Sequence, residues 1–105
     1  MTLLPPAFLV IGPFRYSVMF DEVEAESLAV TDTDTLVMTL DPKMPDSKMA
    51  TILLHEILHT LTEVTGLAQE WSAAKEEEVV GRLAPALGAA IRDNPQLIKY
   101  LQEAL

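Results

Sequence analysis

The two histidines of the chain lie four residues apart, in the segment His55-Glu56-Ile57-Leu58-His59. On an α-helix, residues i and i+4 lie one turn apart on the same face, so both imidazoles can reach one metal ion. A His-Glu-x-x-His segment on a helix is typical of zinc-dependent hydrolases, in which the glutamate is the general base. We therefore predict that His55 and His59 bind Zn²⁺ and that Glu56 takes a proton from a metal-bound water.

The surrounding segment 50–66 has the pattern of a half-buried helix. At about 100° per residue, its apolar side chains fall on one broad arc, whereas both histidines and Glu56 fall on the opposite arc. The apolar arc comprises Ala50, Leu53, Leu54, Ile57, Leu61 and Val64. Asp46 or Ser47 can cap the start of this helix, and Gly66 is a typical residue just past its end.

The alternative to a metal site is a pair of histidines that serve the structure alone. Against it, the motif uses both histidines of the chain and lies within a strongly apolar segment. Unpaired polar groups are costly in such a segment, because burial removes their water without supplying a partner. These observations favour metal binding.

A catalytic zinc usually has three protein ligands and a water. The chain has no cysteine and no further histidine, so the third ligand has to be a carboxylate. The run Glu76-Glu77-Glu78 opens the next predicted helix, whose buried face we expect to consist of Val80, Leu83, Ala84 and Leu87. Counting back three or four residues from Val80 gives Glu77 or Glu76 on that face. Glu78 rotates away towards solvent. We predict Glu77 as the third ligand; the alternatives left open are Glu76, Glu70, Asp41 and no carboxylate.

The rest of the sequence predicts one α+β domain over residues 1–105. Short apolar or alternating segments predict four strands, which we expect to form a small N-terminal antiparallel sheet. These strands are expected at residues 8–11, 14–20, 28–30 and 35–40. Three helices should follow: the motif helix, a second from after Ser72 towards Ile91 with a kink or break near Pro85, and a third from Asn94-Pro95.

Composition excludes several classes of partner. The formal net charge is −9 and the seven basic residues are scattered, which disfavours binding to nucleic acid. The apolar start of the chain lacks a basic region and is interrupted by two prolines, so we expect neither a signal peptide nor a membrane span. The absence of cysteine excludes disulfides and is compatible with a cytoplasmic location.

The segments TILLHEILHTL and EEEVVGRLA resemble the minimal gluzincins, the HExxH-plus-glutamate zincins. Among these they are most similar to compact proteins related to the ImmA/IrrE metallopeptidases, including phage and prophage proteins. In that family a hydrophobic–small pair lies six and seven residues after the ligand glutamate, so Leu83-Ala84 points back to Glu77. The chain departs from the family in its short connection from His59 to Glu77 and in Gly81, where relatives often have Asn or Asp. The resemblance covers about residues 35–91.

The residues and the resemblance together imply zinc-dependent hydrolysis of a peptide bond in a protein or peptide substrate. The strand Thr35–Leu40, if it lies at the sheet edge, would align an extended substrate by backbone pairing. The main alternative is a zinc-stabilised binding or regulatory module without turnover, because so short a chain has little room for a substrate-selecting subdomain. A third hypothesis is an acidic interaction partner without metal.

Overall fold

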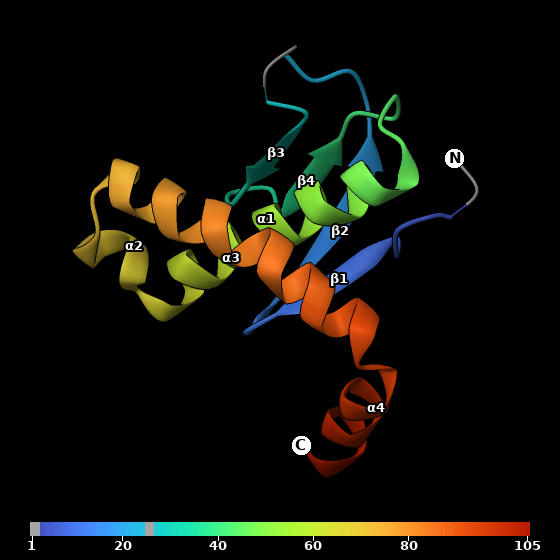
Figure 1. The fold of residues 1–105 in the computed structure, drawn as a ribbon. Helices are drawn as coiled ribbons and strands as arrows, with labels where there is room; N and C mark the ends of the chain where they lie inside the picture. Colours follow the sequence, from blue (N-terminus) through green and yellow to red (C-terminus); the bar gives the residue numbers. More distant parts are fainter. Residues whose placement is uncertain (1–2, 25–26) are drawn as a thin grey trace.

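The computed structural model describes residues 3–24 and 27–105, which form an N-terminal sheet followed by helices (Figure 1). The strands are β1 (Phe8–Ile11), β2 (Phe14–Phe20), β3 (Ala29–Asp32) and β4 (Val37–Leu40). The helices are α1 (Asp46–Thr65), α2 (Leu67–Glu70), α3 (Ala73–Asp93) and α4 (Pro95–Ala104). The predicted α+β class is therefore confirmed. The short helix α2, between the first two expected helices, was not predicted.

The sheet has the order β1-β2-β4-β3 and is mixed. The outer pairs β1–β2 and β3–β4 are antiparallel, whereas β2 and β4 run parallel, with Ser17 opposite Val37. The prediction of a purely antiparallel sheet is wrong for this central pair. The reason is that β3 and β4 enter the sheet as a hairpin. Its returning strand, β4, lies against β2 and therefore shares the direction of β2.

The same topology shows which strands lie at the edges of the sheet. β4 is an inner strand whose Met38 and Leu40 are fully buried, so the segment 35–40 cannot be the edge. The edge on that side is β3. An alternating pattern shows which side chains face the core, but it does not show which strand lies next to which, and here the hairpin places the later strand inside.

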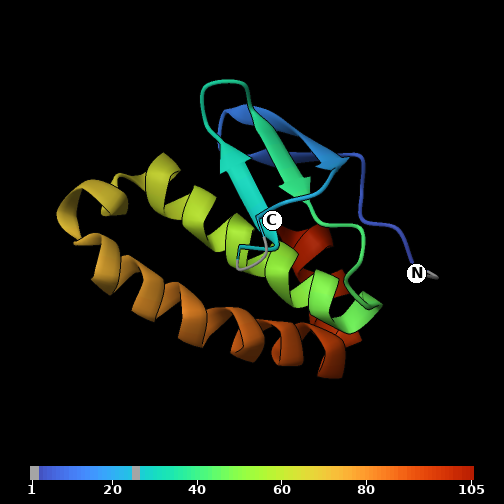
Figure 2. The same ribbon diagram turned by 90° about the horizontal axis from the view of Figure 1, so that it is seen from above.

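Helix α1 lies between the sheet and α3, so the molecule has three layers (Figure 2). Two groups of buried side chains fill the space between α1 and the sheet. One contains Val18, Ala29, Leu40, Met44 and Met49, and the other contains Ile11, Tyr16 and Met38. Leu53 of α1 packs against both groups. The sheet therefore covers one face of the motif helix, and α3 packs against another.

The helix boundaries follow from local chemistry. Helix α1 begins at Asp46, after Pro45 at the capping position, and ends before Gly66, whose φ of 85° is left-handed. Helix α3 begins after Ser72, whose hydroxyl accepts a hydrogen bond from the backbone N–H of Lys75 at 3.1 Å. Helix α4 begins at Pro95, as predicted.

The expected break near Pro85 does not occur, because α3 continues through this residue to Asp93. Val80 and Ala84, before the proline, are buried in the α3 face that packs on α1, and Gly88, after it, comes close to Leu54 of α1. Packing on both sides of Pro85 thus holds the helix together despite the missing backbone donor. No helix in the described part of the chain is long and apolar enough to cross a membrane.

Candidate metal site

The two histidines lie where the helical spacing of α1 predicts. Their rings are 4.7 Å apart between centroids and inclined by 64°. The Nε2 atom of His55 lies 3.1 Å from the Nε2 atom of His59, so the same nitrogen of each ring points into a shared space. Both side chains are about three-quarters buried, at 25% and 23% exposed.

Glu77 of α3 completes this group. One carboxylate oxygen, Oε1, lies 3.0 Å from Nε2 of His55, and the other, Oε2, lies 3.0 Å from Nε2 of His59. His55, His59 and Glu77 form a group that could hold a metal ion. Of the other predicted alternatives, Asp41 lies elsewhere and accepts a hydrogen bond from the backbone N–H of Lys43. Glu70 belongs to α2 and is not part of the group.

The donor set fits a divalent transition metal. Ligands at about 2.0–2.1 Å from a tetrahedral zinc lie roughly 3.3 Å from one another, close to the observed spacings of 3.0–3.1 Å. Hydrogen bonds alone cannot satisfy the two facing Nε2 atoms and the Glu77 carboxylate together, because a neutral imidazole carries only one N–H. A cation bound by all three would satisfy both nitrogen lone pairs and the carboxylate charge together. Two imidazoles and one carboxylate suit zinc and several other first-row metals.

Glu76 contacts the opposite side of His59. Its Oε2 lies 2.5 Å from Nδ1 of His59, whereas Glu77 faces Nε2 of the same ring. Because successive helical residues point about 100° apart, the two adjacent glutamates of α3 reach different nitrogens. Glu78 points away and pairs with Arg82 at 3.5 Å, as predicted.

Glu56 lies beside the metal-binding group but is not part of it. Its Oε2 accepts a hydrogen bond of 2.7 Å from the hydroxyl of Thr31 on the edge strand β3. The sequence analysis did not identify Thr31. No local pattern indicates this contact, because it depends on how β3 lies across α1.

Two surface hollows adjoin the group, and Glu56 and His59 line both of them. The first is also lined by Thr31, Thr33, Thr60, Glu63 and Glu76. The second is also lined by Ser27, Ala29, Ile52, His55 and Glu77. The general-base candidate and one predicted ligand therefore face solvent-accessible space on both sides.

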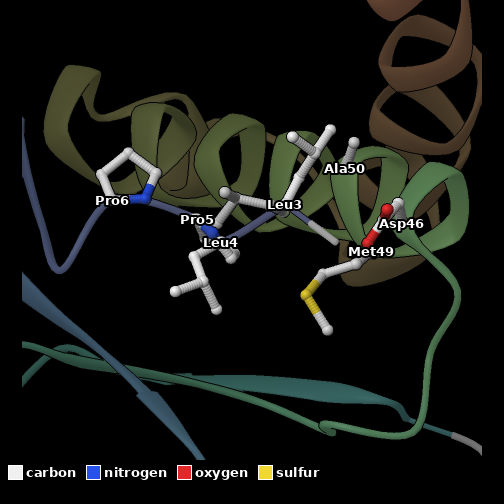
Figure 3. A pocket seen from close by; sticks show the side chains of 8 residues that line it. Leu3, Leu4, Pro5, Pro6, Asp46, Met49 and Ala50 are labelled. Carbon is white, nitrogen blue, oxygen red and sulfur yellow. The ribbon is translucent and has the colours of Figure 1, made fainter. Parts of the chain in front are cut away.

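A separate, apolar pocket lies at the start of α1 and contains none of these side chains. The N-terminal segment from Leu3 to Pro6 crosses the helix there, opposite Met49 and Ala50 (Figure 3). Apart from Asp46 its lining is apolar, so the pocket offers mainly packing surface.

In comparisons with known proteins, no protein-family model, no curated protein and no solved structure matches the chain.

Proposed function

We propose that the protein is a zinc-dependent peptide hydrolase of the gluzincin type, related to the ImmA/IrrE metallopeptidases. One observation carries the proposal: three metal-binding side chains converge from two helices, and a carboxylate outside that group lies beside them. His55, His59 and Glu77 form the group, and Glu56 is the separate carboxylate. Hydrolysis at a metal requires metal ligands and a separate general base, because the base has to accept a proton and so cannot itself bind the metal.

The metal-binding group, Glu56 and Thr31 each have a separate role in hydrolysis. A zinc ion held by the group would supply a water of lowered pKa, near 7, and polarise the substrate carbonyl. Glu56 accepts a proton from the attacking water and then donates it to the leaving amine as the peptide C–N bond breaks. Thr31 orients Glu56 for both transfers, because its hydroxyl donates to one carboxylate oxygen and leaves the other available.

The edge strand β3 is the feature that best accommodates a peptide substrate. It borders the hollow that contains His55 and Glu77, through Ala29, and it carries Thr31. An extended peptide can add to an exposed strand edge by backbone hydrogen bonds, which would place a carbonyl near the metal group. The expected substrate is therefore an extended segment of a protein or peptide, and the expected location is the cytoplasm.

Metal content and two substitutions test the proposal. Protein purified without added metal should contain close to one equivalent of zinc. We expect it to cleave a mixture of fluorescence-quenched peptides. His59→Ala should lose both metal and cleavage, whereas Glu56→Gln should keep the metal and lose cleavage by several orders of magnitude.

The same pair of variants identifies the alternative, a zinc-stabilised binding module. If Glu56→Gln kept the full biological effect while His59→Ala lost metal and stability, catalysis would be excluded. Wild-type protein that purifies free of metal and does not bind added zinc would refute both functions.

A further inference from the structure

The two adjacent glutamates Glu76 and Glu77 have different surroundings although both face His59. The Glu77 side chain is 63% exposed and lies on the Nε2 side of the imidazole, with His55. The Glu76 side chain is only 18% exposed and lies on the Nδ1 side, where it makes the shortest contact of the site. Burial matters here because water competes less for a hydrogen bond that it cannot reach.

We propose that Glu76 is a positioning residue that holds His59 in the tautomer able to bind metal. A neutral imidazole carries its proton on one nitrogen and has a lone pair on the other. Carboxylates face both ring nitrogens, Glu76 at Nδ1 and Glu77 at Nε2. The shorter and more buried contact of Glu76 favours the proton on Nδ1, which leaves the lone pair of Nε2 for a metal. Such partners orient a metal-binding histidine and raise its basicity.

The start of α3 makes Glu76 suited to this role. The backbone N–H of Glu76 donates to the carbonyl of Ser72 at 3.0 Å, and the Ser72 side chain caps the same turn. Four residues later, Val80 is buried in the α3 face that packs on α1. The backbone on either side of Glu76 is thus held in place, by the cap at Ser72 and by buried Val80. The Glu76 carboxylate can therefore contact His59 with little loss of backbone entropy.

The inference rests on the proposed function for the identity of the metal, but its test begins without metal. In metal-free protein, nitrogen-15 NMR should show a proton on Nδ1 of His59. Glu76→Ala should shift His59 towards the Nε2–H tautomer. Glu76→Gln should retain the Nδ1–H form, because its amide oxygen still accepts a hydrogen bond.

The second measurement is the zinc affinity of each variant, determined by competition with a chelator. We expect Glu76→Ala to weaken binding by roughly 10–100-fold, Glu76→Gln to weaken it less, and the matched control Glu78→Ala to change it by no more than about twofold. Glu78 lies in the same acidic run but pairs with Arg82 away from the site. If Glu76→Ala did not fold, Glu76→Leu, which keeps most of the side-chain volume but has no acceptor for Nδ1–H, would carry both measurements against Glu78→Ala.

The two proposals fail differently. A wild type that binds no zinc refutes the proposed function, while the tautomer of His59 still decides the role of Glu76. Unchanged tautomer and unchanged affinity in the Glu76 variants, with a zinc-binding wild type, would overturn the positioning role and leave the metal site standing.

Helices α3 and α4 both carry exposed apolar side chains. Leu83, Leu87 and Ile91 follow one another at four-residue spacing along α3 and are all exposed. On α4, Leu97 and Leu101 are also exposed, and no described residue of that helix is buried. Both helices therefore present apolar side chains to solvent. Leu83 also lines a hollow together with Leu58 and Leu61 of α1.

The total surface is larger than that of an ordinary monomer. The accessible area is 7329 Å², whereas a folded monomer of 11.6 kDa is expected to expose about 5,800 Å². The radius of gyration, 14.0 Å, likewise exceeds the roughly 13 Å expected for this length. The excess of about 1,500 Å² is more than the roughly 800 Å² that each partner contributes to a standard interface.

We infer that this α3–α4 surface (Leu83, Leu87, Ile91, Leu97 and Leu101) pairs with the same surface of a second copy of the chain. Charge favours a second copy as the occupant. Residues 80–105 carry three basic and two acidic side chains, a net charge of +1, whereas the whole chain carries −9. Two copies that meet through the near-neutral helices keep their acidic parts apart, whereas a basic partner would be attracted to the acidic part instead.

Sedimentation velocity over a concentration series tests the inference. The wild type should sediment as a dimer, Leu87→Glu and Leu101→Glu should raise the dissociation constant at least tenfold, and Val10→Glu, at an exposed position on β1, should not. A wild type that stays monomeric up to about 100 μM, a concentration at which even weak specific dimers form, would overturn it. Equal effects of all three substitutions would also contradict it, because that result would point to nonspecific association.

Discussion

Gly12, in the turn between β1 and β2, has no room for a side chain. Its φ is +59°, and a Cβ added there would lie 2.5 Å from the Cγ1 atom of Val64 near the end of α1. Carbon atoms in contact are normally about 3.5–4.0 Å apart. Val64 cannot easily turn aside, because a β-branched side chain in a helix has one strongly preferred rotamer. This close approach holds the β1–β2 hairpin against the helix that carries the histidines.

Gly12→Ala should therefore destabilise the protein by about 2–4 kcal/mol. The left-handed backbone conformation costs a residue with a Cβ about 1–2 kcal/mol. Overpacking against Val64 adds about 1–3 kcal/mol. Against these, the alanine restricts the unfolded chain and returns about 0.5–1 kcal/mol. For a chain of this length the net change corresponds to a fall in Tm of roughly 10–20 °C.

A double-mutant cycle separates the two causes. Urea unfolding of wild type, Gly12→Ala, Val64→Ala and the double variant would give the four stabilities. Because Val64→Ala removes the atom that would clash, the double variant should be more stable than the sum of the single effects predicts, by about 1–3 kcal/mol. A Gly12→Ala variant within about 0.5 kcal/mol of wild type would refute the close approach. If the effects of Gly12→Ala and Val64→Ala were additive, the left-handed backbone conformation alone would account for the destabilisation by Gly12→Ala.

Three further predictions follow from single contacts. Thr31→Val keeps the side-chain shape but removes the donor to Glu56, so peptide cleavage should fall about tenfold while zinc affinity stays the same; equal loss of both would contradict this role. The backbone N–H groups of Thr35 and Asp34 hold the pKa of Asp32 below its ordinary value of 3.8. This stabilisation is present above pH 3.8 and is lost as pH falls through the lower folded-state pKa. In thermal melts the Tm difference between wild type and Asp32→Ala should accordingly shrink in acid, and a constant difference would argue against it. Pro85→Ala restores a backbone donor inside α3 and should raise the free energy of unfolding by about 2 kcal/mol, measured with urea; lower stability would show that the proline ring is needed for packing.

Local periodicity accounts for what the sequence could predict. The helix α1, its end at Gly66 and the approach of His55 to His59 all depend on residues within a few positions of one another. The position of Glu77 needs one further step, the orientation of α3. Val80 and Ala84 of the predicted buried face supply that step because they are buried, whereas Leu83 and Leu87, predicted on the same face, are exposed.

Apart from the short helix α2, the features that were not predicted depend on segments distant in the sequence. The orientation of the β3–β4 hairpin decides whether β4 pairs with β2 or lies at the edge of the sheet. The alternation of apolar and polar residues within a strand does not show this orientation. The contact from Thr31 to Glu56 joins residues 25 positions apart and depends on the same placement of β3. Glu76 and Glu77 were both considered as ligands, and only the direction of α3 separates their roles.

The candidate site and the helix packing depend on one another. Glu76 and Glu77 belong to the first turns of α3, which packs mainly on α1, the helix that carries both histidines. Val80 and Ala84, which follow on the same helix, are buried in that packing. A metal bound by His55, His59 and Glu77 would tie the two helices together at the end where α2 connects them. The packing that closes the core thus sets the distance between the ligands, and a metal would in turn strengthen the packing of a helix that has little contact with the sheet.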